Sequence, residues 1–170
     1  METADIILAK AKFEDWKSMY QNIWSRPESA QYMQWNLTQS EEDARRRIER
    51  TIEYQKTHDT YIVYEKRTGE AIGFAGVEEI GPGIFREAGI ALGPEYVGRG
   101  YGKQILNMLM AYCVREFGAR TFYYSTWDAN AASKALALSC GFSYMYSEPK
   151  VDQKTGRDYK LETYSKRLVD

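Results

Sequence analysis

A glycine-rich segment places the strongest constraint on how this chain folds. It runs from Gly93 to Gln104 and joins a predicted strand, Glu87 to Leu92, to a predicted helix, Tyr101 to about Phe117. Glycine alternates with other residues over five positions, so no side chain blocks close approach to the backbone there. These glycines are Gly98, Gly100 and Gly102. The pattern predicts a tight loop at the start of a helix.

The chemistry of this loop suits an anion. The first N–H groups of a helix have no partner within the helix, and the helix dipole places positive charge at the same end. Phosphate is a ligand that such helix starts favour. Arg99 and Lys103 add two cationic side chains. The segment therefore predicts a phosphate site, and the alternative is a glycine-rich turn that binds nothing.

Spacing separates the phosphate-binding loops that such a segment resembles. A P-loop requires G-x-x-x-x-G-K-[ST], but the glycines here enclose one residue too few, and Gln104 follows Lys103 where a hydroxyl is needed. A dinucleotide loop requires G-x-G-x-x-G directly after a buried strand, but the third glycine comes one residue early and Gly93 to Val97 intervene. Asp128 would imitate the ribose-binding acid, so a dinucleotide-binding protein remains a weaker alternative. The pyrophosphate loop of an acyl-CoA transferase fits the spacing best.

Two motifs carry a resemblance to a known family. Val97 to Gly102 is similar to the [QR]-x-x-G-x-[GA] loop of the GNAT N-acetyltransferase superfamily, with Val97 in place of Gln or Arg. Asn130-Ala-Ala-Ser133, followed by Leu136 and Gly141-Phe142, resembles the N-x-x-S…GF segment of the branch of ribosomal-protein N-terminal acetyltransferases. The resemblance implies an enzyme that moves an acetyl group from acetyl-CoA directly to a primary amine.

The resemblance also implies which residues hold acetyl-CoA, and it implies no metal. In such folds the strand before the glycine loop splays from its neighbour and leaves a slot. The backbone of Ile90, Ala91 and Leu92 would pair there with the pantetheine arm. Asn130 and Ser133 would lie beside the cofactor. The pyrophosphate would contact the loop residues Val97, Gly98, Arg99, Gly100, Tyr101, Gly102 and Lys103.

Aminolysis of a thioester needs a base for the amine and a donor for the departing thiolate. Glu87 is the candidate base, acting through water, because the resembling branch often places an acid there; an exposed strand glutamate is the alternative. Glu78 and Glu79 are rivals, since either faces the slot depending on register. Ser133 is the candidate donor to the thiolate, although a helix N-cap and a first-turn serine explain Asn130 and Ser133 structurally as well.

One position departs from the pattern of many GNAT enzymes. They carry a tyrosine acid four residues before the glycine of the GF pair, and Ala137 stands there in this chain. Tyr144 and Tyr146 are aromatic alternatives that the sequence does not place. A module that binds CoA as a sensed ligand without catalysis is therefore the alternative function.

The order of strands argues against a doubly wound nucleotide fold. Tyr61 to Lys66 and Glu70 to Ile80 are predicted strands joined by a Thr68-Gly69 turn, and Gly81 to Gly83 turns the chain into a third strand from Arg86 to Leu92. Three successive strands without an intervening helix form an antiparallel meander. We therefore expect one α+β domain over residues 1–170, with a mixed, mostly antiparallel sheet of about seven strands and about four helices.

The remaining elements follow from periodicity and punctuation. Ser40 is placed to cap a helix that runs to about Lys56, and the arginine-rich face of this helix, from Arg45 to Arg50, is predicted to be solvated rather than to bind RNA. Asn130 is placed to cap a short helix that ends at Gly141. The other predicted elements are a strand at 6–11, a helix at 15–24, a break at 25–29, and strands at 121–126, 142–147 and 159–166.

Composition limits the partners. The chain has 170 residues, a formal net charge of −1 and a pI of about 6.0, which does not favour nucleic acid. One histidine and two cysteines make no convincing zinc site, and Cys113 and Cys140 are predicted to be buried free thiols. We see neither a signal peptide nor an apolar run long enough for a membrane span, and expect a soluble, cytoplasmic protein.

The acceptor is the least determined part of the sequence. In chains of the resembling family the first two helices and their connecting loop wall the acceptor pocket. Aromatic residues in that region belong either to the core or to the pocket. In the pocket, their ring faces would hold the cationic amine. A protein N-terminus, an antibiotic, a polyamine and an amino acid all remain open as acceptors, and so do a monomer and a homodimer. The large side chains concerned are Tyr20, Trp24, Tyr32, Met33, Trp35 and Trp127.

Overall fold

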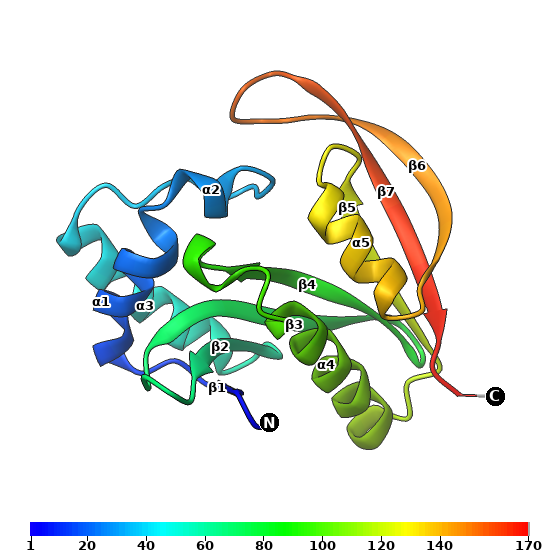
Figure 1. The fold of residues 1–170 in the computed structure, drawn as a ribbon, viewed down its shortest axis with the longest axis horizontal. Helices are drawn as coiled ribbons and strands as arrows, with labels where there is room; N and C mark the ends of the chain where they lie inside the picture. Colours follow the sequence, from blue (N-terminus) through cyan, green and yellow to red (C-terminus); the bar gives the residue numbers. More distant parts are fainter. Residues whose placement is uncertain (170) are drawn as a thin grey trace.

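The computed structural model describes residues 1–169, and its centre is a seven-stranded sheet (Figure 1). The strands lie in the order β1-β2-β3-β4-β5-β7-β6. β4 and β5 are parallel, and the other neighbouring strands are antiparallel. The predicted α+β fold with a mixed, mostly antiparallel sheet is confirmed. The strand bounds are β1 Ile6–Ala9, β2 Thr60–Glu65, β3 Ala71–Gly81, β4 Ile84–Leu92, β5 Thr121–Trp127, β6 Ser143–Val151 and β7 Asp158–Arg167.

Five helices pack around the sheet within residues 1–169. α1 continues without a break into a π-helical turn, Tyr20–Trp24, so the predicted helix at 15–24 is present in distorted form. α2 is a single helical turn where the sequence predicted a break, because Pro27 occupies the first helical position, which proline favours. The helix bounds are α1 Trp16–Met19, α2 Pro27–Ala30, α3 Glu41–Gln55, α4 Tyr101–Phe117 and α5 Ala131–Ser139.

The signals at the helix ends act as predicted. At the start of α3, the Ser40 hydroxyl oxygen accepts a hydrogen bond from the Asp43 N–H at 3.1 Å. At the start of α5, Asn130 Oδ1 accepts from the Ser133 N–H, also at 3.1 Å. Gly118 ends α4 in the left-handed conformation, with φ at 62°. These caps fix where α3 and α5 begin and where α4 ends.

Two apolar clusters cover the sheet. Alternate residues of β2 point to different clusters, Val63 to one and Ile62 to the other, so the clusters lie on opposite faces. The first packs beneath α4 and includes Leu109, and the second packs beneath α1 and α3 and includes Ile48. The core therefore holds α4 and α5 on one face and the N-terminal helices on the other.

The parallel strands β4 and β5 separate along most of their length. They pair at three positions, of which Arg86 with Tyr123 is the last. Beyond it both strands continue, but they are no longer paired with each other. Close to this point Gly89, with φ at 101°, lies in an irregular stretch of the β3–β4 register. A slot opens between the two strands, in agreement with the splay that the sequence resemblance implied.

The C-terminal hairpin extends past the rest of the sheet and bends toward α2 (Figure 1). β6 continues to Val151, beyond its predicted end, because it pairs with β7 along its length. In the turn of the hairpin, Lys154 Nζ donates a hydrogen bond to the Ala30 carbonyl oxygen at 2.7 Å. The hairpin thus reaches across the open end of the slot.

Candidate active site

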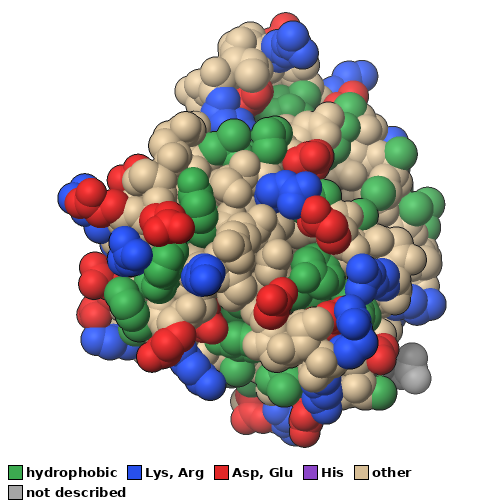
Figure 2. Space-filling view, turned by 60° about the vertical axis from the view of Figure 1, so that its left-hand side comes forward, with side chains coloured by type: hydrophobic (Ala, Val, Ile, Leu, Met, Phe, Trp, Pro, Cys, Tyr) green, Lys and Arg blue, Asp and Glu red, His purple; other side chains and the backbone are tan. Residues whose placement is uncertain are grey.

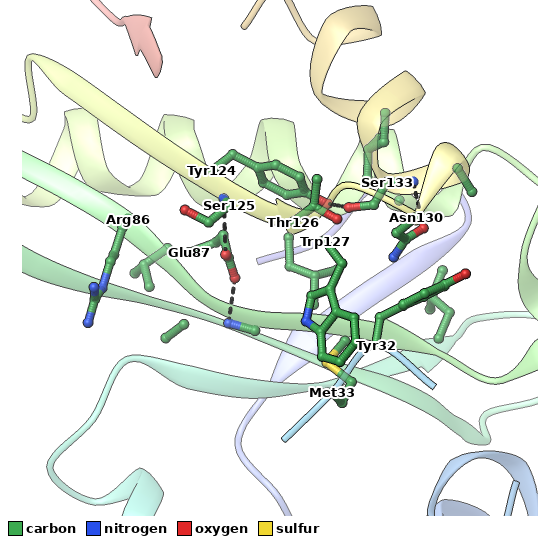
Figure 3. Close-up of a pocket in the computed structure, with 18 of the residues that line it drawn as sticks. Tyr32, Met33, Arg86, Glu87, Tyr124, Ser125, Thr126, Trp127, Asn130 and Ser133 are labelled. Atoms are coloured by element: carbon green, nitrogen blue, oxygen red, sulfur yellow. Dashed lines mark hydrogen bonds between the residues drawn. The ribbon is translucent and has the colours of Figure 1, made fainter. Parts of the chain in front are cut away.

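The slot between β4 and β5 holds a cavity of about 1000 Å³. Its lining comes from both faces of the sheet: from the glycine loop, α4 and α5 on one side, and from α3 and the loop after α2 on the other. Figure 3 shows the middle of this cavity, where side chains of β4, β5 and α5 converge. We call it the main cavity. It connects the two faces through the sheet.

The glycine loop forms one end of the main cavity. Gly98 and Gly100 have φ at 76° and 79°, in the left-handed region that glycine adopts readily, and both line the cavity. Within residues 1–169, the backbone N–H groups from Gly98 to Lys103 donate no hydrogen bond. Six donors without a partner at the start of α4, together with the helix dipole, provide a site for a pyrophosphate.

Two side chains of the loop turn away from the main cavity. Arg99 Nη1 donates to Glu65 Oε1 at 3.1 Å, and the Tyr101 hydroxyl donates to the same oxygen at 2.9 Å. The Glu65 side chain is only 1% exposed, and Thr68 donates to its other oxygen. Burial raises the pKa of Glu65, but the hydrogen bonds from Tyr101 and Thr68 and the charges of Arg67 and Arg99 outweigh it and lower that pKa. Arg99 and Tyr101 thus face β2, and only their backbone groups remain for a ligand.

The other residues predicted to bind the cofactor lie in and around the slot. Ile90 and Leu92 line the main cavity, whereas Ala91 is buried and is not part of its lining. Val97 and Lys103 line it beside the loop, with Lys103 exposed. Asn130 and Ser133 line it from the first turn of α5. The predicted set therefore surrounds one cavity, apart from Ala91 and the side chains of Arg99 and Tyr101.

Glu87 lies between the separated strands. One carboxylate oxygen accepts the Gly89 N–H at 2.7 Å, and the other accepts the Ser125 N–H of β5 at 3.4 Å (Figure 3). Burial raises the pKa of Glu87 to about 7, although both backbone hydrogen bonds oppose the rise. A carboxyl group with that pKa is present in both protonation states near neutral pH, which is the range a general base needs.

The rival glutamates are less well placed. Glu78 lines the main cavity but pairs with Arg86, its cross-strand neighbour. Glu79 is not in the lining, and its carboxylate accepts the Gly83 N–H in the β3–β4 turn at 3.0 Å. Of the three glutamates, Glu87 is the one that lies between β4 and β5, and its carboxylate forms no ion pair within residues 1–169.

A tyrosine that the sequence analysis missed lies next to Ser133. The hydroxyls of Tyr124 and Ser133 are 2.7 Å apart, and both residues line the main cavity (Figure 3). Burial raises the pKa of Tyr124, so its hydroxyl keeps its proton. Tyr144 and Tyr146, the aromatic alternatives, lie exposed on β6 and are not in the lining. The alternation of buried residues in β5, where Tyr124 shares the face of Phe122, was the signal available in the sequence.

Aromatic side chains form the end of the main cavity opposite the glycine loop. Tyr32 contacts Trp127 edge to face, with ring centroids 5.8 Å apart, and Trp127 stacks on Tyr159 at 3.7 Å. Tyr54 stacks on His58 at the same cavity. Met33 also lines it, as the sequence allowed, but Tyr159, Tyr54 and His58 were not anticipated.

The remaining aromatic candidates belong to the core. Trp24 is buried among the side chains of the N-terminal helices, and Tyr20 and Trp35 pack against that cluster. They are not in the lining of the main cavity. The aromatic end of the main cavity is therefore formed by fewer of the predicted residues, together with residues more distant in the sequence.

Residues 1–169 contain neither a metal-binding cluster nor a membrane-spanning helix. This part of the chain contains no group of three or more His, Cys, Asp or Glu side chains positioned to hold a metal ion. None of its helices is both long and apolar enough to cross a membrane. Cys113 and Cys140 are buried free thiols, as predicted.

Solved acetyltransferases have a similar fold. A GNAT-family acetyltransferase from Bacillus anthracis superposes with a TM-score of 0.84 at 15% identity, over 99% of this chain and 98% of that one. An acetyl transferase from Salmonella typhimurium that modifies the N-terminal serine of the 50S ribosomal subunit protein L7/L12 gives 0.79 at 20% identity, over 99% and 97%. A spermidine N-acetyltransferase from Vibrio cholerae, solved with CoA and spermine, gives 0.77 at 15% identity, over 98% and 97%.

The sequence itself identifies the family. No protein of curated function matches it. Residues 5–143, which contain the glycine loop, the slot and α5, match the acetyltransferase (GNAT) domain. Because this match extends over most of the chain, the protein belongs to the GNAT acetyltransferase family.

Proposed function

We propose that this protein transfers an acetyl group from acetyl-CoA directly to a primary amine. One observation carries the proposal: a single cavity joins six backbone N–H groups, which have no partner within residues 1–169, to a carboxyl group whose pKa is about 7. The first feature suits the pyrophosphate of CoA, and the second suits an amine that must lose a proton. Family membership supports the same reaction.

The residues that would hold acetyl-CoA follow from the cavity. The loop N–H groups from Gly98 to Lys103 would bind the pyrophosphate, with Lys103 nearby. The unpaired edge of β4, from Ile90 to Leu92, would bind the pantetheine amides. Asn130 and Ser133 would border the thioester end from α5. Solved relatives support this use of the cavity, since one of them holds CoA.

Glu87 would act as the general base. The amine reaches the slot as an ammonium ion, and Glu87 in its ionised form accepts one proton from it, directly or through a water. The neutral nitrogen then attacks the acetyl carbonyl carbon and the N–C bond forms. As the C–S bond breaks, the nitrogen loses its second proton, which neutralises the departing thiolate and leaves CoA as the free thiol. Because burial favours the protonated carboxyl group, Glu87 also holds the proton until product leaves.

Ser133 would stabilise the departing thiolate. If Tyr124 donates its hydrogen bond to Ser133, the serine hydroxyl hydrogen is free to point at the sulfur. The pair thereby supplies the donor that Ala137 does not. The sensor alternative rested on the missing acid at Ala137. Because the Tyr124–Ser133 pair offers a donor in its place, a non-catalytic CoA sensor is the weaker alternative.

The decisive experiment measures turnover without knowing the acceptor. Purified protein is incubated with acetyl-CoA and a panel of amines and short peptides, and free thiol and acetylated product are followed by a thiol reagent and mass spectrometry. We expect thiol release that depends on at least one amine. Tight binding of CoA with no release over the whole panel would instead support the sensor. A thermal shift larger with NAD than with acetyl-CoA would contradict the proposed ligand.

A further inference from the structure

The arginine run on α3 divides into two pairs with different surroundings. Arg45 and Arg46 form ion pairs with the glutamates one turn earlier in the helix. Arg47 and Arg50 have no carboxylate within ion-pair distance in the part of the chain that the structure describes. The sequence explains why: one turn before Arg50 stands Arg46, and one turn before Arg47 stands Asp43. The Asp43 carboxylate accepts the Ser40 hydroxyl at 2.9 Å and is used in the helix cap.

The Arg47 guanidinium is half-buried and only partly satisfied. It lies over the rings of Trp24 and Trp35, at 4.6 Å and 4.7 Å from their centroids. Its Nη1 donates to Thr38 Oγ1 at 3.1 Å and to the Asn36 carbonyl oxygen at 3.4 Å. Its Nε and Nη2 groups have no hydrogen-bond partner within residues 1–169. Burial, followed by the charge of Arg50, lowers the pKa of Arg47 to about 10, which is the expected result for a cation without a counter-ion.

These two arginines line a second cavity, of about 630 Å³, which we call the α3 cavity. Its charged side chains are Arg47, Arg50 and Asp43, so its net charge is positive. Thr38 and Thr51 add hydroxyl groups, and the rest of the lining is Trp35, Asn36, Leu37, Gln39 and Tyr54. Tyr54 lines the main cavity as well, so the two cavities are neighbours that share this residue.

The net positive charge is confined to the α3 cavity and does not extend over the surrounding surface. Figure 2 turns the side that carries α1, α2 and α3 forward, and basic and acidic side chains alternate over it rather than forming a patch of one sign. A surface of this kind does not offer the continuous basic track that a nucleic acid backbone follows. Selection for an anion therefore rests on the α3 cavity and not on the face as a whole.

We propose that the α3 cavity binds an oxyanion, a carboxylate or a phosphate, that belongs to the acceptor molecule. The proposal rests on the function proposed above and narrows the acceptor to an amine that also bears an acidic group. Guanidinium groups pair with carboxylate and phosphate oxygens through parallel N–H bonds, and Arg47 retains donors for this purpose. Cation–π contacts explain how Arg47 is held, but they leave the charge of Arg50 without a counter-ion.

The first test measures anion binding without turnover. Inorganic phosphate is titrated calorimetrically into protein saturated with CoA, so that the glycine loop is already occupied. Removing a hydrogen bond to a charged group costs about 1.5–3 kcal/mol, so Arg47→Gln and Arg50→Gln should each weaken phosphate binding roughly tenfold or more. Arg46→Gln is the matched control, because Arg46 belongs to the same run and pairs with Glu42. Equal phosphate affinity in all four proteins would overturn the site.

The second test identifies the source of the anion. Amines are compared in matched pairs, such as a peptide with an acidic residue near its N-terminus and the same peptide with the amide. We expect kcat/KM to favour the acidic member at least tenfold in the wild type and in Arg46→Gln, and the preference to disappear in Arg50→Gln. Because Arg50 is exposed, this variant keeps the test valid if Arg47→Gln does not fold. Phosphate binding with no acidic preference would refute the acceptor assignment. Phosphate binding with no acetyl transfer at all would refute the proposed function and leave the oxyanion site standing.

Discussion

The two ends of the main cavity differ in how they present their binding groups. The glycine loop offers backbone N–H groups from one continuous segment, whose shape depends on Gly98 and Gly100 having positive φ. The aromatic end offers side chains from a loop, α3, β5 and β7, which lie far apart in the sequence. Backbone recognition tolerates side-chain changes such as Val97, whereas side-chain recognition changes with single substitutions. If the loop end binds acetyl-CoA and the aromatic end binds the amine, as proposed, this difference would let one fold keep a common donor while its acceptor varies.

The largest effect is expected where the two ends meet, at Glu87. Glu87→Gln removes the proposed base, and general bases contribute about 10²–10⁴-fold, so kcat should fall by that factor at neutral pH. KM for acetyl-CoA should stay near the wild-type value, because the loop is untouched. In the wild type, kcat/KM should rise with pH through about 7, where Glu87 ionises. Full activity in Glu87→Gln across the pH range would assign the base to Glu78 or to a water chain.

The raised pKa of Glu87 predicts that the free energy of unfolding depends on pH. Its pKa in the folded protein is about 7, above the ordinary value of 4.5, so the folded state keeps a proton that the unfolded state loses between these pH values. The wild type should therefore lose up to about 3 kcal/mol of unfolding free energy as pH rises from 4.5 to 7. Glu87→Gln should lack this loss. Urea unfolding of both proteins at pH 4.5 and pH 8 measures the difference, and parallel changes in both would contradict the assignment.

A smaller effect is expected at Ser133. Ser133→Ala removes the proposed hydrogen bond to the thiolate, and such a bond is worth about 1.5–3 kcal/mol, so kcat should fall roughly tenfold to a hundredfold. Unlike the loss at Glu87, this loss should persist at high pH, where the amine needs no base. Tyr124→Phe should reduce kcat in the same direction, since it removes the partner hydroxyl. Ser143→Ala, at an exposed serine of β6 that does not line the main cavity, is the control.

At the loop end, Gly100→Val should weaken CoA binding, by about tenfold or more if one charge-assisted contact is lost. Valine disfavours the φ of 79° found there and places a branched side chain beside the N–H groups. Gly118→Val is the matched control, because Gly118 has φ at 62° at the other end of α4. Both variants should lose stability, but only Gly100→Val should lose CoA affinity by calorimetry. An equal affinity in the two would show that the loop does not bind the pyrophosphate.

At the aromatic end, Trp127→Ala should raise KM for the acceptor and leave KM for acetyl-CoA unchanged. Trp127 contacts Tyr32 and stacks on Tyr159, and aromatic pairs contribute about 0.5–1.5 kcal/mol beyond their buried area. We expect a rise of severalfold, measured with whichever amine the panel identifies. An equal rise in KM for the acceptor and KM for acetyl-CoA would mean that the two ends of the main cavity do not bind the two substrates separately.

The smallest effect is expected behind the loop, at Glu65. This buried carboxylate accepts from Arg99 and Tyr101 and so holds the loop from the side of β2. Glu65→Gln should raise KM for acetyl-CoA severalfold while kcat stays constant, and Glu65→Asp should recover part of the affinity. A fall in kcat without a change in KM would exclude a role in positioning the loop.

Features encoded by local sequence were predicted well. Gly100, Gly118, Ser40 and Asn130 act at the helix ends where their backbone or capping preferences place them. The antiparallel meander from β2 to β4 followed from short turns between apolar strands. Such features depend on a few neighbouring residues, so a single sequence contains the information that determines them.

Features that depend on tertiary contacts were not predictable in the same way. Arg99 and Tyr101 were predicted to contact the pyrophosphate as part of the loop, with Arg99 adding a cationic side chain, but the sequence does not indicate that both side chains bond to a distant glutamate on β2. Tyr159 and Tyr54 reach the main cavity because β7 and α3 pack beside it, and no local pattern indicates this. Glu87 was identified as an acid, but its raised pKa comes from burial between strands that only the folded chain brings together.

The short pairing of β4 with β5 also has a mechanical consequence. Three residue pairs at one end join two leaves of the sheet, one made of β1 to β4 and the other of β5, β7 and β6. At the open end the leaves meet through side-chain contacts, Tyr32 against Trp127 and Lys154 on the Ala30 carbonyl. A ligand that pairs with the free edge of β4 acts as an additional strand and ties the leaves together along the slot. We therefore expect a ligand in the slot to strengthen the connection between the two leaves at the open end.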